Sequence, residues 1–213
     1  MQKDYTHITM VVDRSGSMAR IRSDAEGGVN AFIKDQEAAG GKCTLTLVDF
    51  DEEYRVIVAG VDLSVATPRY ELVPRGLTAM NDAIGKAMVE TGEFLSAMKE
   101  EDRPGLVVFV IVTDGDENAS EEYDAKQIKD MIKKQEAEYS WKFTFLAANI
   151  DAFAAGGNLG VASSAVMSFA AGSVRSAYAA ASSSVTRGRA ATSRSADAFA
   201  AMSYTAEERD AAQ

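Results

Sequence analysis

Short apolar runs rich in β-branched and aromatic residues alternate along the chain with segments in which apolar residues recur every three or four positions. The runs are typical of strands, and the three-to-four spacing places apolar side chains on one face of a helix. The pattern predicts strands at His7–Asp13, Cys43–Phe50, Tyr54–Val61, Leu106–Thr113, Lys142–Ala148 and Ala165–Phe169.

The clearest helical stripe runs from Met80 to Met98, and shorter ones cover residues 29–36, 125–139 and 174–185. The run "LVVFVIV" has no polar alternation, which is typical of a central parallel strand covered on both faces. Only "DEE" separates two of the strands, so they should form an antiparallel hairpin at a sheet edge. The sequence therefore predicts an α/β fold: a doubly wound, Rossmann-like sheet, mostly parallel, with helices on both faces.

The pattern also suggests a boundary near residue 189. Residues 1–189 are expected to form one domain, and residues 190–213 an Ala/Ser-rich C-terminal tail. Thr205 to Glu208 has the form of a capping box, which predicts a short last helix. We expect this tail to dock loosely on the domain, with ordering by a partner as the alternative.

Charge narrows the classes of partner. The formal net charge is −10, and the excess acid lies within residues 1–150. Nucleic acids and anionic membranes bind basic surfaces, so neither is expected as a partner. The single cysteine, Cys43, permits no intrachain disulfide and fits a strand core. No signal peptide or membrane span is recognised, so we expect a cytoplasmic location: the host cytoplasm or the virion if the chain is phage-encoded.

Polar residues follow two of the predicted parallel strands where those strands end. "DRSGSM" begins at Asp13, and "VTDGDEN" places Asp114 after the "LVVFVIV" strand. Thr78, in "RGLTAMNDAIG", stands at the start of the Met-striped helix. The carboxyl ends of parallel strands share one edge of such a sheet, so these groups should meet there. Two carboxylates with hydroxyl groups form an all-oxygen set suited to a hard divalent cation such as Mg²⁺.

Simpler interpretations exist for the same residues. Ser15 and Ser17 are also suited to capping the next helix, with Asp13 in a turn. The acidic stretch after Asp114 has calcium-loop spacing at first, but it lacks the required glycine and the final glutamate. No phosphate-binding G-x-x-x-x-G-K-[ST] motif occurs. The sole histidine, His7, is expected to begin the first strand and to be structural.

Taken together, the three motifs resemble those of von Willebrand factor type A (VWA) domains, as found in short stand-alone bacterial and phage members. "DRSGSM" matches their Asp-x-Ser-Gly-Ser motif, and the resemblance covers residues 5–187 in element order. It implies a metal-ion-dependent adhesion site (MIDAS) whose ligands are Asp13, Ser15, Ser17, Thr78 and Asp114. The usual Gly-Gly-Thr is replaced, because Leu77 precedes Thr78.

The resemblance implies a non-enzymatic protein-binding module that holds Mg²⁺, with Mn²⁺ or Ca²⁺ as alternatives. In the family, a partner's Asp or Glu completes the metal shell, whereas here Asp116 and Glu117 would repel an acidic partner. One alternative function is a structural or assembly subunit of a phage particle or bacterial stress complex, docked through the tail. A metal-assisted phosphoester hydrolase is the other, weakened by the lack of a nearby base.

Overall fold

The computed structural model describes residues 1–148 and 150–213. Six strands form one sheet in the order β3-β2-β1-β4-β5-β6. Their bounds are β1 Gln2–Asp13, β2 Lys42–Phe50, β3 Tyr54–Asp62, β4 Pro104–Thr113, β5 Lys142–Ala148 and β6 Val166–Phe169. β2 and β3 pair antiparallel, and the other neighbouring strands pair in parallel. The predicted fold class and the edge hairpin are therefore confirmed, although β1 begins at Gln2 rather than at His7.

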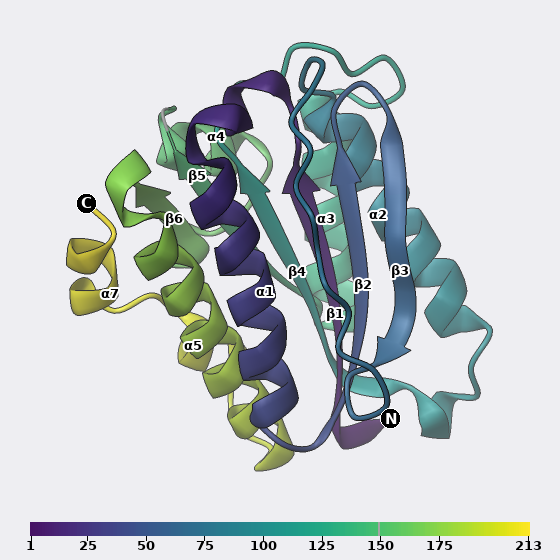
Figure 1. Ribbon diagram of the computed structural model, residues 1–213. Coiled ribbons are helices and arrows are strands. Elements are labelled where there is room, and N and C mark those ends of the chain that lie inside the picture. The colour runs from purple at the N-terminus through teal and green to yellow at the C-terminus, as the bar shows by residue number, and fades with distance from the viewer. Residues whose placement is uncertain (149) are drawn as a thin grey trace.

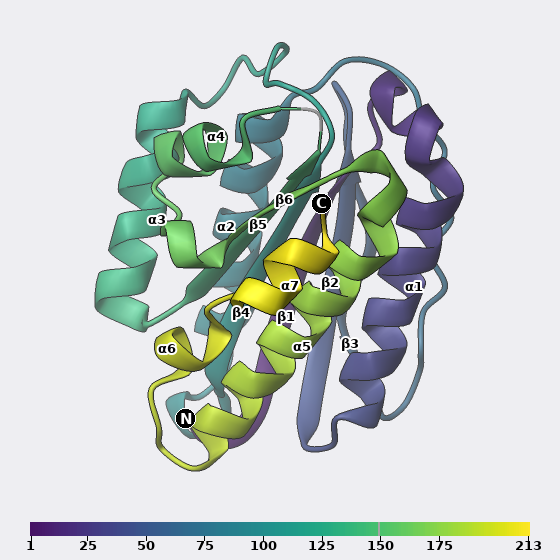
Figure 2. The ribbon, with the colours of Figure 1, turned by 90° about the vertical axis from the view of Figure 1, so that its left-hand side faces the viewer.

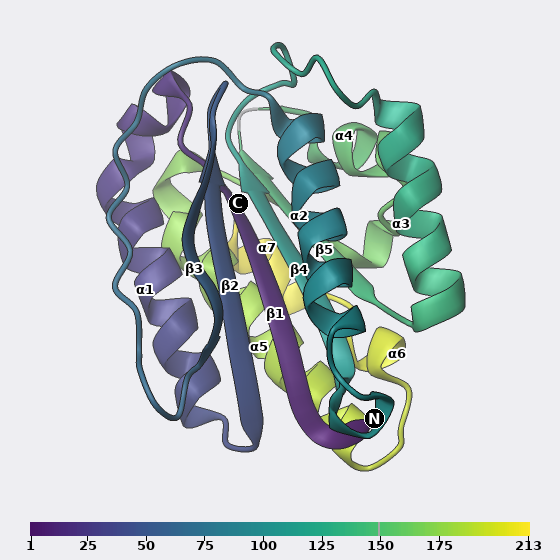
Figure 3. The same ribbon diagram turned by 90° about the vertical axis from the view of Figure 1, so that its right-hand side faces the viewer.

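The main helices cover both faces of the sheet. They are α1 Arg22–Ala38, α2 Met80–Ser96, α3 Ala125–Tyr139, α4 Ala152–Asn158 and α5 Val174–Ser193. Helices α1 and α5 lie on one face, and α2, α3 and α4 on the other (Figures 1 and 3). Within the described residues, no helix is both long enough and apolar enough to cross a membrane.

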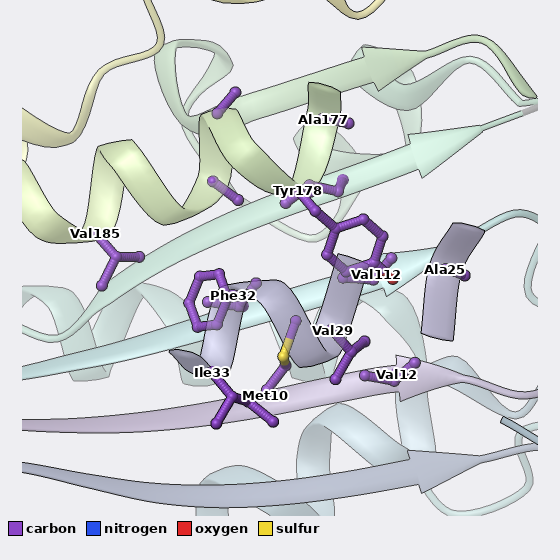
Figure 4. Close-up of a cluster of buried hydrophobic side chains, with 14 of the residues drawn as sticks. Met10, Val12, Ala25, Val29, Phe32, Ile33, Val112, Ala177, Tyr178 and Val185 are labelled. Carbon is purple, nitrogen blue, oxygen red and sulfur yellow. The ribbon is translucent and has the colours of Figure 1, made fainter. Parts of the chain in front are cut away.

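Each face of the sheet has its own hydrophobic core. Alternate side chains of β1 point to opposite faces, so Met10 packs with α1 and α5 while Val11 packs with α2. On the first face, Phe32 of α1 and Tyr178 of α5 belong to one cluster of buried side chains over the strands (Figure 4). This double burial explains why the central strands lack polar alternation.

The segment after residue 189 packs closely against its own domain. Helix α5 continues to Ser193, and the short helices α6 Ala198–Met202 and α7 Ala206–Ala211 lie against it (Figure 2). Tyr204 is buried, and its hydroxyl is 2.6 Å from Thr144 Oγ1. Arg209 donates to the carbonyl oxygen of Val166 on the short edge strand β6. The segment thus covers a sheet edge that would otherwise expose unpaired backbone groups. The predicted capping box at Thr205 is present.

One expectation from the sequence is wrong in detail. His7 does not begin β1 but lies within it, fully buried, with its ring nitrogens near Thr44 and Thr9. Burial lowers the pKa of His7 to about 4. Near the end of α5, Arg189 is also buried, and it donates to the carbonyl oxygens of Gln36 and Gly40.

Candidate metal centre

Asp13 ends β1 at the carboxyl edge of the sheet, where the arrowheads of β1, β2 and β4 lie together (Figure 1). Its side chain is fully buried. The Ser15 backbone N–H donates to Oδ1 over 2.6 Å, and the Thr113 hydroxyl donates to Oδ2 over 2.6 Å. Thr113 reaches Asp13 because β1 and β4 are neighbours, with Val12 opposite Val112. These two bonds fix the orientation of the carboxylate.

Asp114 follows β4 at the same edge and is 2 % exposed. The Ser17 hydroxyl donates to its Oδ1 over 2.5 Å, and Ser17 Oγ is 3.0 Å from Ser15 Oγ. The other carboxylate oxygen, Oδ2, is buried and has no hydrogen-bond partner among the described residues. An unpartnered buried acceptor is costly, by about 1–3 kcal/mol, and more when the group is charged. This atom therefore calls for a positively charged or hydrogen-bond-donating ligand.

Thr78 comes to the same place from the loop before α2 and is also buried. Its backbone N–H donates to Oδ1 of Asn118 over 2.9 Å, which ties this loop to the one after β4. A methyl group built on Gly115 would lie 3.3 Å from Ser17 Oγ and 3.6 Å from Thr78 Oγ1. The hydroxyls of Ser17 and Thr78 thus flank the residue that follows Asp114. All five residues predicted as ligands come together at one edge of the sheet.

The serine hydroxyls do not serve the helix that follows them. Ser15 is the N-cap residue of the short 3₁₀ helix Gly16–Ile21, yet its side chain makes no capping bond. The next helix, α1, has Ile21 at its N-cap. The simpler interpretation, in which these serines are helix caps, is therefore wrong. Their hydroxyls lie instead beside each other and beside Asp114.

The electrostatics of this cluster disfavour two bare carboxylates. Burial raises the pKa of Asp13 to about 6, although hydrogen bonds from Thr113 and Ser15 act in the opposite direction. The negative charge of Asp114 raises it further. Burial also raises the pKa of Asp114, while the Ser17 hydrogen bond lowers it. A cation between the two groups would favour both ionised forms.

Arg14, the second residue of "DRSGSM", anchors this loop through buried charge. Its guanidinium Nη2 lies 3.2 Å from Oδ1 of Asp51, and its Nε lies 3.5 Å from Oδ1 of Asp49. Both aspartates are fully buried. Arg75, in the loop that leads to Thr78, pairs with Asp51 over 2.8 Å. These residues carry no signal in the sequence, because a lone arginine inside a motif gives no sign of its distant partners.

The two acids that follow Asp114, Asp116 and Glu117, differ in their surroundings. The carboxylate of Glu117 accepts hydrogen bonds from the backbone of Asn81, Ala119 and Ser120 and from the Ser120 hydroxyl. Its charge is used to hold this loop onto the start of α2. Asp116 remains exposed to solvent.

No family model matches the sequence, and no curated protein sequence does so either. Solved structures match at low identity. A von Willebrand factor type A protein from Catenulispora acidiphila has a TM-score of 0.55 at 13 % identity, over 89 % of this chain and 43 % of that one. The von Willebrand factor domain of the type V pili tip protein Mfa5 from Porphyromonas gingivalis has a TM-score of 0.57 at 10 % identity, over 86 % of this chain and 95 % of that one.

This chain has the VWA fold. A third structure with this fold is proximal thread matrix protein 1 from the mussel byssus with a zinc-occupied MIDAS motif. It has a TM-score of 0.54 at 15 % identity, over 78 % of this chain and 41 % of that one. The present chain therefore spans less than half the length of the Catenulispora and mussel proteins.

Within this VWA fold, the candidate ligands suit a hard cation. Across residues 1–148 and 150–213, no cluster of three or more His, Cys, Asp or Glu side chains is placed to hold a metal. The candidate centre instead combines two carboxylates with three hydroxyl groups, and hydroxyl oxygen is a ligand for Mg²⁺ and Ca²⁺ rather than for thiophilic metals. Leu77, which replaces a glycine of the usual motif, is 56 % exposed beside Thr78 and leaves the hydroxyl set intact.

Proposed function

We propose that this chain is a non-enzymatic protein-binding module that depends on a divalent cation, with Asp13, Ser15, Ser17, Thr78 and Asp114 as the metal ligands. The observation that carries the proposal is the buried, unpartnered Oδ2 of Asp114, held beside a second carboxylate and three hydroxyls. A divalent ion supplies a positive centre with coordination positions open to an oxygen atom from outside the chain. Mg²⁺ is the first choice, and Mn²⁺ and Ca²⁺ are the alternatives.

The residues of the chain prepare this site before any partner arrives. Thr113 and the Ser15 backbone orient Asp13, and Ser17 orients Asp114. The Arg14 cluster holds the metal loop against the loops that follow β2 and precede Thr78. The partner then contributes an Asp or Glu side chain to the metal. Because the Glu117 carboxylate accepts hydrogen bonds from Asn81, Ala119 and Ser120, it is held within its own loops, and the repulsion expected from it is reduced.

The alternatives receive less support. A hydrolase needs a general base, and the sole histidine is buried inside β1 among threonines. An assembly subunit that docks through residues 190–213 would need that segment free, whereas Met202, Tyr204 and Ala212 are buried against their own domain. A role in a phage particle or a stress complex stays a secondary proposal.

Thermal melts in EDTA, Mg²⁺, Mn²⁺ and Ca²⁺ test the metal centre. An ion at one hundred times its dissociation constant stabilises the native state by about 2.7 kcal/mol. For a chain of this size that corresponds to a rise in Tm of about 5–10 °C. Asp114→Asn should abolish the rise, while Asp130→Asn, an exposed acid on α3, should retain it. A wild-type melt that no ion changes would contradict the proposal, and metal-dependent hydrolysis of p-nitrophenyl phosphate would favour the hydrolase.

A further inference from the structure

A cavity of about 280 Å³ lies beside the candidate metal centre. It opens between the start of α2, the loop after β4 and the first turns of α4. Met80 and Asn81 line it just after Thr78 in the chain, and Asp116 lines it just after Asp114. A protein docked on the metal would therefore have this cavity within reach of a neighbouring side chain.

The polar groups of this cavity favour an occupant that donates hydrogen bonds. The described residues that line it include no Lys, Arg or His. Asp116 and Asp151 are exposed carboxylates from two different segments. Asn81 is only 5 % exposed, and its side-chain Oδ1 has no hydrogen-bond partner among the described residues. A buried amide oxygen without a partner is destabilising, and a donor that enters the cavity would remove that cost.

Glu117 and Asn158 add two more polar groups to the lining, and its apolar part comes from Met80, Ala125, Ile150, Ala154, Ala155 and Leu159. The occupant should therefore have an apolar stem and a cationic head, as long basic side chains do. Acceptors on separate segments suit a guanidinium group better than an ammonium group, because its five N–H donors spread in one plane.

We infer that this cavity binds the arginine side chain of the protein partner that docks on the metal centre. The inference rests on the proposed function for the docking itself, whereas the cavity needs no metal to form. It gives the partner a stated chemistry: an arginine close to the carboxylate that reaches the metal.

Acidic surroundings on the other side of the α2 start favour the same kind of partner. A second cavity, of about 230 Å³, is lined by Glu52, Asp82 and Glu121 among others. Its one basic lining residue, Lys86, pairs with Glu122 over 2.7 Å. The negative potential on both sides attracts a basic surface and speeds its encounter with the site.

A titration followed by ¹H–¹⁵N NMR tests the inference on the full chain. The probe is N-acetyl-arginine amide, and the matched control is N-acetyl-citrulline amide, which has the same shape without the charge. We expect saturable shifts at the backbone amides of Asn81, Asp116 and Ala154, and about tenfold weaker binding of citrulline. The Asp116→Asn/Asp151→Asn double variant should weaken arginine binding by about tenfold or more, and asparagine at 151 still caps α4. Asp130→Asn should leave it unchanged.

Each outcome bears on one claim. Equal binding of arginine and citrulline amides, or shifts confined to other parts of the chain, would overturn the inference. N-acetyl-lysine amide binding as tightly as the arginine probe would overturn the guanidinium assignment in favour of any cation. Repeating the titration in EDTA separates this site from the metal. If arginine still binds and no ion changes the thermal melts, the proposed metal-dependent function is refuted while arginine binding by the cavity is retained.

Discussion

Gly27 and Gly28 are neighbours in α1, but a methyl group would meet different surroundings at each. At Gly27, which is exposed, an added Cβ would have no atom within 4 Å. At Gly28 it would lie 2.5 Å from both Cγ and Cδ2 of the Tyr178 ring on α5. Tyr178 is 1 % exposed and is held among the side chains between α1, α5 and the sheet (Figure 4). The same substitution should therefore have opposite effects at these two positions.

The expected magnitudes follow from helix propensity and from packing. Alanine is better than glycine inside a helix by about 0.8–1.0 kcal/mol, so Gly27→Ala should raise the free energy of unfolding by about 1 kcal/mol. Gly28→Ala gains the same amount, but carbon atoms prefer separations of about 3.5–4.0 Å, and relieving the overlap costs about 3 kcal/mol. Helix α5 cannot move away freely, because Gln36 of α1 donates to Ser182 and Thr186. Gly28→Ala should therefore lower the free energy of unfolding by about 2 kcal/mol.

Urea denaturation followed by circular dichroism measures both variants under one condition, in EDTA. The two should differ by about 3 kcal/mol in the free energy of unfolding, with equal m-values, and by about 6–12 °C in Tm. Stabilisation of both variants by the same amount would refute the reasoning, because it would mean that Tyr178 moves aside without cost. Destabilisation by Gly27→Ala would refute it as well, since nothing in α1 opposes a methyl group there.

Three further changes test other parts of the structure. The pKa of His7 is about 4 in the folded state and about 6.5 in the unfolded state. Its contribution to the free energy of unfolding is therefore complete above pH 6.5 and falls by about 3 kcal/mol towards pH 4. Urea titrations across this pH range should show that fall as the difference between wild type and His7→Gln. Arg14→Met leaves two buried carboxylates without their cation and should lower the free energy of unfolding by about 3 kcal/mol, whereas Arg14→Lys should lose less. The control Lys126→Met, at an exposed ion pair, should change the urea midpoint little. Tyr204→Phe loses the bond to Thr144 and should cost about 1 kcal/mol and speed proteolysis of the last residues, while the exposed Tyr139→Phe should do neither.

The fold class could be predicted from the sequence because its signals are local. The apolar "LVVFVIV" run, the three-residue hairpin connection and the stripe from Met80 to Met98 each depend on neighbours a few residues apart. The rule that ligands bind at the carboxyl ends of parallel strands then selected the candidate residues, and the structure brings Asp13, Ser17 and Asp114 together at that edge.

Only the tertiary structure decided the interactions between distant segments. The hydrogen bond from Thr113 to Asp13 depends on the register of β1 against β4, and the Arg14 cluster depends on how three loops meet. Burial of His7 and Arg189 follows from the same packing, although the sequence pattern placed His7 at the start of a strand.

The surface that a partner would meet was also decided by the fold. Asp116 and Glu117 are side by side in the sequence and at the edge of one cavity, but the fold engages Glu117 in hydrogen bonds within the chain and leaves Asp116 exposed. Residues 190–213 look like a loosely docked tail in sequence, yet their few apolar residues are buried against β6 and α5. Composition determined which groups are present, and long-range packing determined which remain available for binding, because burial depends on segments far apart in the chain.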